Sequence, residues 1–159
     1  MLHFDEKGFL KPDKAILSDI NEMVRYFVNG IDSETRKINF DKYIRYSTDL
    51  KKYSGGSDLK QWIDGSFVTL KVNPNDIDLV TFIDQVQMQR LGAHIGNFRG
   101  DYGRKLYGVD AYIVEVFEPE SKFHSYSIGD AAYWLELFST TVTNRFDKKS
   151  RKGFLEIMF

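Results

Sequence analysis

The sequence contains no cysteine. Disulfide bonds, thiolate metal sites and cysteine nucleophiles are therefore excluded. No run of about eighteen apolar residues is present, so a membrane-spanning helix is not expected. The first residues carry acids where a secretory signal carries a basic region followed by an apolar stretch. These absences predict a cytoplasmic protein.

The net charge is close to zero, and histidines are few. The net charge of −1 argues against a broad nonspecific nucleic-acid surface, because such affinity comes from many Lys and Arg contacts to phosphates. The three histidines, His3, His94 and His124, have no metal-ligand spacing, and neither a Ser-His-Asp nor a zinc pattern is present. We therefore expect the histidines to be non-catalytic.

The chain has the length of one domain, and its thirteen Phe and nine Tyr among 159 residues favour a compact core. Helix and strand patterns occur together, and the predicted fold is α/β (α+β), with a small mixed sheet flanked by helices. We expect a helical N-terminal part over residues 1–58. Residues 59–159 are expected to form the sheet core that carries the functional site.

Local patterns predict the individual elements. Four segments have the apolar periodicity or the capping residues of helices: 12–28, 32–53, 84–98 and 127–138. Four segments have the apolar, β-branched and aromatic content of strands: 59–64, 76–82, 109–117 and 153–159. The glycine-rich segment 96–108 is expected to be a mobile loop near the site. Its cations are candidates for contact with a triphosphate, or simply solvated: Arg99, Arg104 and Lys105.

The segment 62–84 contains the main candidate site. A Gly65-Ser66 pair follows the first strand of the core, and Asp76 and Asp78 occupy alternate positions near the start of the second. Side chains at positions i and i+2 of a strand point to the same face, and two neighbouring carboxylates repel each other. The two aspartates therefore either lie at an open end of the sheet or bind a metal ion.

Gly65 allows the backbone to approach a ligand closely, and nearby amides with the Ser66 hydroxyl can hold phosphate oxygens. Phosphate at this pair and Mg²⁺ at the two aspartates would together form a site for a nucleoside triphosphate. The structural alternative is a Gly-Ser turn followed by a strand with a solvated acidic edge. Lys71 lies between the two motifs and is either a phosphate contact or a surface lysine.

A Gly-Ser pair at the end of a largely apolar strand, followed after nine residues by Asp-Ile-Asp-Leu, resembles the signature of the polymerase-β-type nucleotidyltransferase superfamily. It is most similar to the minimal nucleotidyltransferases of bacterial toxin–antitoxin and phage-defence pairs. The resemblance implies a nucleotidyltransferase-like fold. It also implies Mg²⁺-dependent transfer of a nucleoside monophosphate from a nucleoside triphosphate to a protein or tRNA acceptor, together with a cognate toxin or defence partner.

The resemblance also implies roles for individual residues. It assigns nucleotide binding to Gly65, Ser66 and Lys71, and catalysis with coordination of two Mg²⁺ ions to Asp76, Asp78 and Asp110. Glu115 is the alternative third carboxylate. It lies an odd number of positions from Asp110, so the two face opposite sides of an unbroken strand. An active enzyme and a catalytically reduced binding module, such as an antitoxin that covers its partner, both agree with this pattern.

Overall fold

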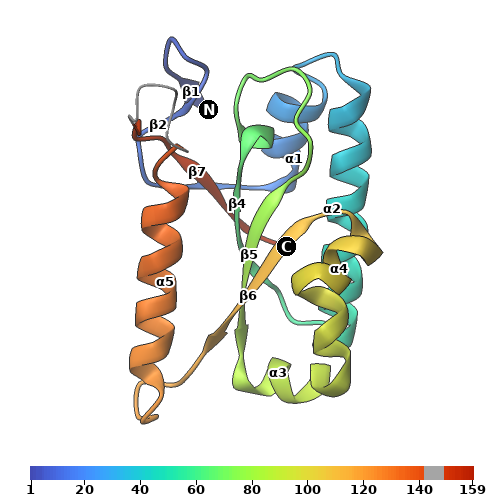
Figure 1. The fold of residues 1–159 in the computed structure, drawn as a ribbon, viewed down its shortest axis with the longest axis vertical. Coiled ribbons are helices and arrows are strands. Elements are labelled where there is room, and N and C mark those ends of the chain that lie inside the picture. The colour runs from blue at the N-terminus through green and yellow to red at the C-terminus, as the bar shows by residue number, and fades with distance from the viewer. Residues whose placement is uncertain (142–148) are drawn as a thin grey trace.

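A five-stranded mixed sheet lies at the centre of the structure (Figure 1). The structure is a computed structural model and describes residues 1–141 and 149–159. In spatial order its strands are β3 (Ala15–Ser18), β7 (Phe154–Met158), β4 (Lys60–Asp64), β5 (Asp78–Asp84) and β6 (Asp110–Val116). β4 is antiparallel to both of its neighbours, whereas the pairs β3–β7 and β5–β6 are parallel. A separate antiparallel pair consists of β1 (His3–Phe4) and β2 (Leu10–Lys11).

The helices flank this sheet, which confirms the predicted α+β class. They are α1 (Ile20–Met23) with a π-helical continuation (Val24–Val28), α2 (Glu34–Tyr53), α3 (Gln85–Leu91) with a 3₁₀ continuation (Gly92–Phe98), α4 (Gly100–Tyr107) and α5 (His124–Phe138). A short 3₁₀ turn (Ser66–Val68) follows β4. Among the helices that the structure describes, none is long and apolar enough to cross a membrane.

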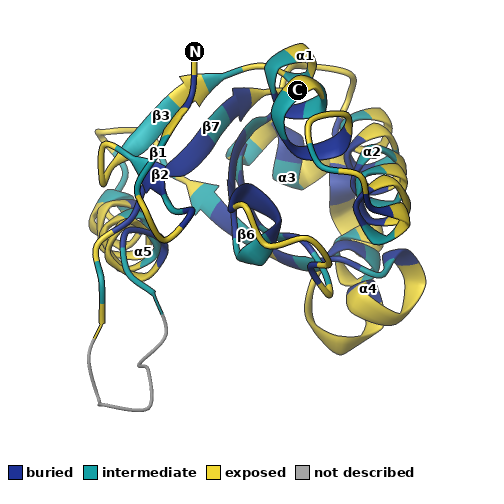
Figure 2. Cartoon of the chain, turned by 90° about the horizontal axis from the view of Figure 1, so that it is seen from above, coloured by how far each residue is buried: buried dark blue, intermediate teal, exposed yellow. Residues whose placement is uncertain are grey.

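The two faces of the sheet are covered differently. The larger core packs α1 to α4 against one face, where Ile63, Leu79 and Ile83 are fully buried. On the opposite face Trp62 and Val80 belong to a small cluster with the end of α5. Figure 2 shows α5 at the edge of the molecule, with much of its surface exposed. This second face is therefore only partly covered, and the candidate site lies on it.

The predicted first helix over residues 12–28 is wrong in its first part. Ala15–Ser18 forms edge strand β3, and the helix begins only at Ile20, where the Asp19 side chain accepts a hydrogen bond from the Glu22 amide. β3 pairs in parallel with β7, more than 130 residues later in the chain. The apolar spacing resembled a helix, but pairing with a distant strand decided the conformation of this segment.

The predicted mobile loop over residues 96–108 is also wrong. The segment is largely helical: a 3₁₀ turn up to Phe98 is followed by α4, which ends at Gly108 in a left-handed conformation with φ of 73°. Phe98 and Tyr107 stack with 5.5 Å between ring centroids, and both contact the ring of Tyr46. Burial of these rings fixes the segment despite its glycines.

The remaining elements depart from expectation only at their ends. The second predicted helix is confirmed as α2, with the Ser33 side chain accepting a hydrogen bond from the Arg36 amide at its start. The last helix begins at His124, three residues before the predicted capping box. The Ser127 hydroxyl instead accepts from the Phe117 amide at 2.8 Å and so ties α5 to the end of β6.

Candidate active site

Three carboxylates lie side by side across β4, β5 and β6. Asp78 is the register partner of Asp64 on one side and of Asp110 on the other. Register partners in neighbouring strands point to the same face of a sheet. The register therefore brings together the predicted Asp78 and Asp110, and adds Asp64, which the sequence reasoning missed. The alternative Glu115 pairs with Ile83 and belongs to the opposite face.

Asp76 lies in the turn before β5 rather than within the strand, and it joins the group through an arginine. Its carboxylate accepts a hydrogen bond from Arg104 at 2.7 Å, and the same guanidinium lies 3.8 Å from Asp110. Asp110 and the hydrogen bond to Asp76 raise the pKa of Arg104. Helix α4 thus places a cation between two of the predicted catalytic carboxylates.

Burial and neighbouring charges both act strongly on Asp78. Its pKa is raised to about 7, first by burial and then by the charges of Asp76, Asp64 and Asp110, while Lys152 opposes the shift. Among the described residues Asp78 has no ion-pair partner. A cation arriving at this position would lower the pKa of Asp78 and relieve the repulsion.

Asp64 is held differently, in a buried ion pair with Lys152. Both residues are only 6% exposed. Burial raises the pKa of Asp64 to about 6, and the charge of Lys152 opposes this rise. The sequence offered one signal for Asp64, namely an acid at the end of a predicted strand directly before the Gly-Ser pair. Its register with Asp78 could not be read from the sequence.

The Gly65-Ser66 pair turns the chain directly against this row of carboxylates. Gly65 adopts φ of 78°, and a β-carbon at this position would collide with the carboxylate of Asp78. Ser66 begins the short 3₁₀ turn that follows. Glycine is therefore needed here for two reasons, since a side chain would be strained and would also displace Asp78.

The loop after this turn is anchored by the fully buried Arg36 of α2. Among the described residues its guanidinium donates hydrogen bonds to backbone carbonyls only, those of Phe27, Phe67, Thr69, Lys71 and Val72. Burial lowers the pKa of Arg36 to about 10. The carbonyl of Lys71 accepts one of these hydrogen bonds, while the Lys71 side chain is exposed and does not line the cavity over the carboxylates. The structure therefore does not bring Lys71 to the other predicted site residues.

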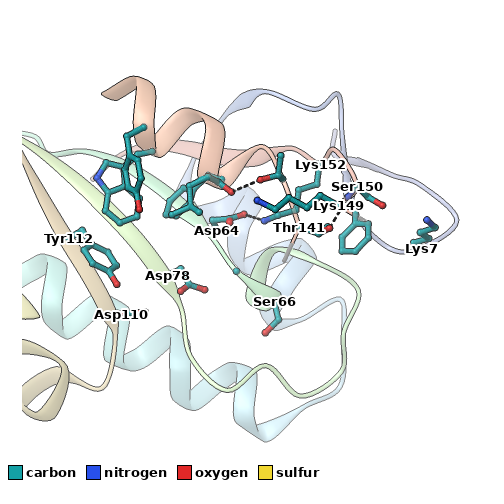
Figure 3. A pocket seen from close by; sticks show the side chains of 17 residues that line it. Lys7, Asp64, Ser66, Asp78, Asp110, Tyr112, Thr141, Lys149, Ser150 and Lys152 are labelled. Atoms are coloured by element: carbon teal, nitrogen blue, oxygen red, sulfur yellow. Dashed lines mark hydrogen bonds and ion pairs between the residues drawn. The ribbon is translucent and has the colours of Figure 1, made fainter. Parts of the chain in front are cut away.

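A cavity of about 1080 Å³ opens over the carboxylate row, between the sheet, α5 and the C-terminal segment (Figure 3). Its acidic floor is formed by Asp64, Asp78 and Asp110, next to Gly65 and Ser66. Aromatic side chains line one part, namely Tyr112, Tyr133, Trp134 and Phe138, and Phe9 also lines the cavity. Lysines line another part: Lys7, Lys149 and Lys152. The cavity therefore offers three different chemistries side by side.

The carboxylates suit a hard divalent cation, because Mg²⁺ prefers oxygen ligands and keeps part of its shell for water and phosphate oxygens. Across residues 1–141 and 149–159, no three acidic or histidine side chains are yet gathered closely enough to enclose a metal ion. Asp78 with Asp110 or Asp64 could supply two ligands. Phosphate oxygens or water would have to supply the others, and with that addition the carboxylates present fit a Mg²⁺ ion.

A family model described as "Family of unknown function (DUF6932)" matches residues 2–158. Neither the curated proteins nor the solved structures contain a significant match. The matched region includes the whole sheet, all the helices and every residue of the candidate site.

Proposed function

The chain belongs to the DUF6932 family, and we propose that it is a Mg²⁺-dependent nucleotidyltransferase. One observation carries the proposal: strand register places Asp78 beside Asp110 on one face, and the Gly65 turn lies directly against Asp78. This arrangement joins the carboxylates to the turn that can hold phosphate. It agrees with the resemblance to polymerase-β-type nucleotidyltransferases.

In the proposed reaction, the oxygen of an acceptor hydroxyl forms a bond to the α-phosphorus of a nucleoside triphosphate. The bond from that phosphorus to the oxygen bridging the β-phosphate breaks, and pyrophosphate leaves with the electron pair. The acceptor proton passes to a carboxylate, for which we favour Asp110 at the start of β6. Gly65 and Ser66 would hold the phosphate chain through the backbone amides of their turn and the Ser66 hydroxyl. Mg²⁺, when bound, would stabilise the charge on the phosphate oxygens and lower the pKa of the acceptor hydroxyl.

We propose a protein hydroxyl or a tRNA end as the acceptor, within a bacterial toxin–antitoxin or phage-defence pair acting in the cytoplasm. This part of the proposal is supported only by the resemblance to minimal nucleotidyltransferases. A cognate toxin or defence partner would then be either the substrate or the regulator of the activity.

The test compares two variants that remove one negative charge from the same strand. Purified protein is incubated with Mg²⁺, α-labelled nucleoside triphosphates and a candidate acceptor, and label transfer is measured. Asp110→Asn is expected to lower transfer by a factor on the order of 10² or more. Glu115→Gln, on the opposite face of β6, should leave transfer close to the wild-type rate. Full activity of Asp110→Asn, or equal loss in both variants, would refute the assignment.

A second candidate is a catalytically reduced, antitoxin-type binding module, and the position of Arg104 favours it. This guanidinium lies between Asp76 and Asp110, where it neutralises charge that a metal would otherwise neutralise. Calorimetry with ATP, GTP, CTP and UTP in the presence of Mg²⁺ separates the two candidates. If neither wild type nor Arg104→Gln binds any triphosphate, the binding module is the better description. Binding that strengthens in Arg104→Gln supports a nucleotide site.

A further inference from the structure

The cavity has an aromatic end that the proposed reaction does not yet use. Tyr112 projects from β6 and Trp134 from α5, with 4.4 Å between their ring centroids and 43° between their planes. Tyr133 packs edge-on against Trp134 at 5.2 Å. All three side chains line the cavity. Tyr112 is 39% exposed and Tyr133 is 61% exposed, so a good part of both rings is free to contact a ligand.

The distance from this aromatic end to the carboxylates is set by the strand. Tyr112 follows Asp110 by two positions on β6, so both side chains point to the same face. The separation along the strand is about 7 Å. In a nucleotide a single ribose separates the base from the α-phosphate. A nucleotide with its α-phosphate at the carboxylates can therefore place its base against Tyr112.

Lysines occupy the other end of the cavity. Figure 3 shows Tyr112 on one side, Asp78 and Asp64 between, and Lys149 and Lys7 on the far side. The order of chemistries along the cavity is therefore aromatic, acidic and basic. A nucleoside triphosphate with bound metal has the matching order of base, metal-bound phosphate and terminal phosphates.

We propose that Tyr112, Tyr133 and Trp134 form a shelf that binds the nucleobase of the triphosphate substrate. The inference rests on the proposed nucleotide site and specifies the direction in which the nucleotide lies. Stacking on aromatic rings accepts any base, because every base has a π-face. The shelf therefore distinguishes nucleoside triphosphates from inorganic polyphosphate more strongly than it distinguishes one base from another.

The experiment measures binding of two probes to the full chain by calorimetry with Mg²⁺ present, namely ATP and inorganic tripolyphosphate. Tyr112→Ala and Tyr133→Ala are each expected to weaken ATP binding by roughly 10-fold, with little change for tripolyphosphate. Tyr126→Ala is the matched control, since Tyr126 is 64% exposed on the same helix as Tyr133 but does not line the cavity. It should bind both probes like the wild type.

A second measurement uses the two tryptophans of the chain. Trp62 is only 7% exposed, whereas Trp134 lines the cavity. ATP should quench tryptophan fluorescence in the wild type, and Trp134→Phe should lose this quenching while it retains the signal of Trp62. A variant that has failed to fold would be recognised by the altered emission of Trp62.

The outcomes separate this inference from the proposed function. If wild type binds ATP but the shelf variants bind it equally well, the shelf is refuted and the nucleotide site stands. If a shelf variant loses ATP and tripolyphosphate to the same extent, the rings support the cavity rather than the base, and the shelf is again refuted. If wild type binds neither probe, both proposals fail together.

Discussion

Replacing Asp78 by asparagine should reveal the electrostatic strain of the carboxylate row. In the metal-free folded protein the pKa of Asp78 is raised from 3.8 to about 7 by burial and by three neighbouring carboxylates. Between pH 4 and pH 7 the folded protein therefore holds a proton that the unfolded chain releases. The free energy of unfolding must fall as pH rises through this window.

The size of this effect follows from the shift. Three pKa units correspond to an upper limit of about 4 kcal/mol. Partial exposure of Asp78 and relaxation of its surroundings reduce this figure, and we expect a loss of about 1–2 kcal/mol between pH 5 and pH 8. Asparagine cannot ionise, so Asp78→Asn should be more stable than wild type at pH 8 by about this amount. The difference should be smaller at pH 5 and should vanish near pH 4, where the aspartate of the unfolded chain is itself protonated. A smaller slope will remain in the variant, because the pKa of Asp64 is also raised.

Urea unfolding followed by circular dichroism, at both pH values and in the presence of EDTA, provides the measurement. Glu115→Gln serves as the control, because it removes the same charge from the opposite face of the sheet. In a second series Mg²⁺ replaces EDTA, and at pH 8 it should stabilise the wild type more than Asp78→Asn, since only the wild type keeps the full set of metal ligands. A variant less stable than wild type at pH 8, or one with an unchanged pH slope, would contradict the reasoning.

Three further substitutions test the surroundings of the site. Gly65→Ala should lower the free energy of unfolding by about 2 kcal/mol or more, because the backbone has a positive φ and the new β-carbon would clash with Asp78. In a double-mutant cycle, Asp78→Ala should reduce that cost. Arg36→Met should cost about 3–5 kcal/mol in thermal or urea unfolding, since several buried carbonyls lose their donor. Lys152→Met should lower the free energy of unfolding by ~3–5 kcal/mol at pH 8, because it leaves Asp64 buried without its counter-charge. This loss of stability should be smaller at pH 5, or when Asp64→Asn is also present.

The sequence was most informative where local patterns decide structure. The strands of the sheet core and helix α2 were predicted from apolar content and capping, and they form close to the expected limits. Strand β3 could not be predicted, because its hydrogen bonds are made with β7 at the other end of the chain. Helix α4 was missed because its glycines suggested a loop, while burial of Phe98 and Tyr107 decides its structure.

In the candidate site, too, local patterns could be read from the sequence and contacts between distant segments could not. Asp78 and Asp110 could be proposed from local motifs and the family resemblance, and the register of β5 with β6 places them side by side. Asp64 and Lys152 meet across 88 residues, and no local pattern marks that pair. Lys71 was placed in the site because it lies between the two motifs. Arg36, 35 residues earlier, instead binds the Lys71 carbonyl, and the Lys71 side chain lies at the surface.

The distribution of cations around the carboxylate row indicates where a metal would enter. Lys152 neutralises Asp64 at one end of the row, and Arg104 links Asp76 and Asp110 at the other. Asp78 lies between these ends, and the ion pairs of the described residues do not include it. Its pKa is correspondingly raised to about 7, above that of Asp64. Protein cations relieve the repulsion at the two ends of the row but not at its centre. Added positive charge is therefore most stabilising at the centre. The centre is also the position against which Gly65 turns the chain, and a cation held there would lie directly beside the turn proposed to bind phosphate.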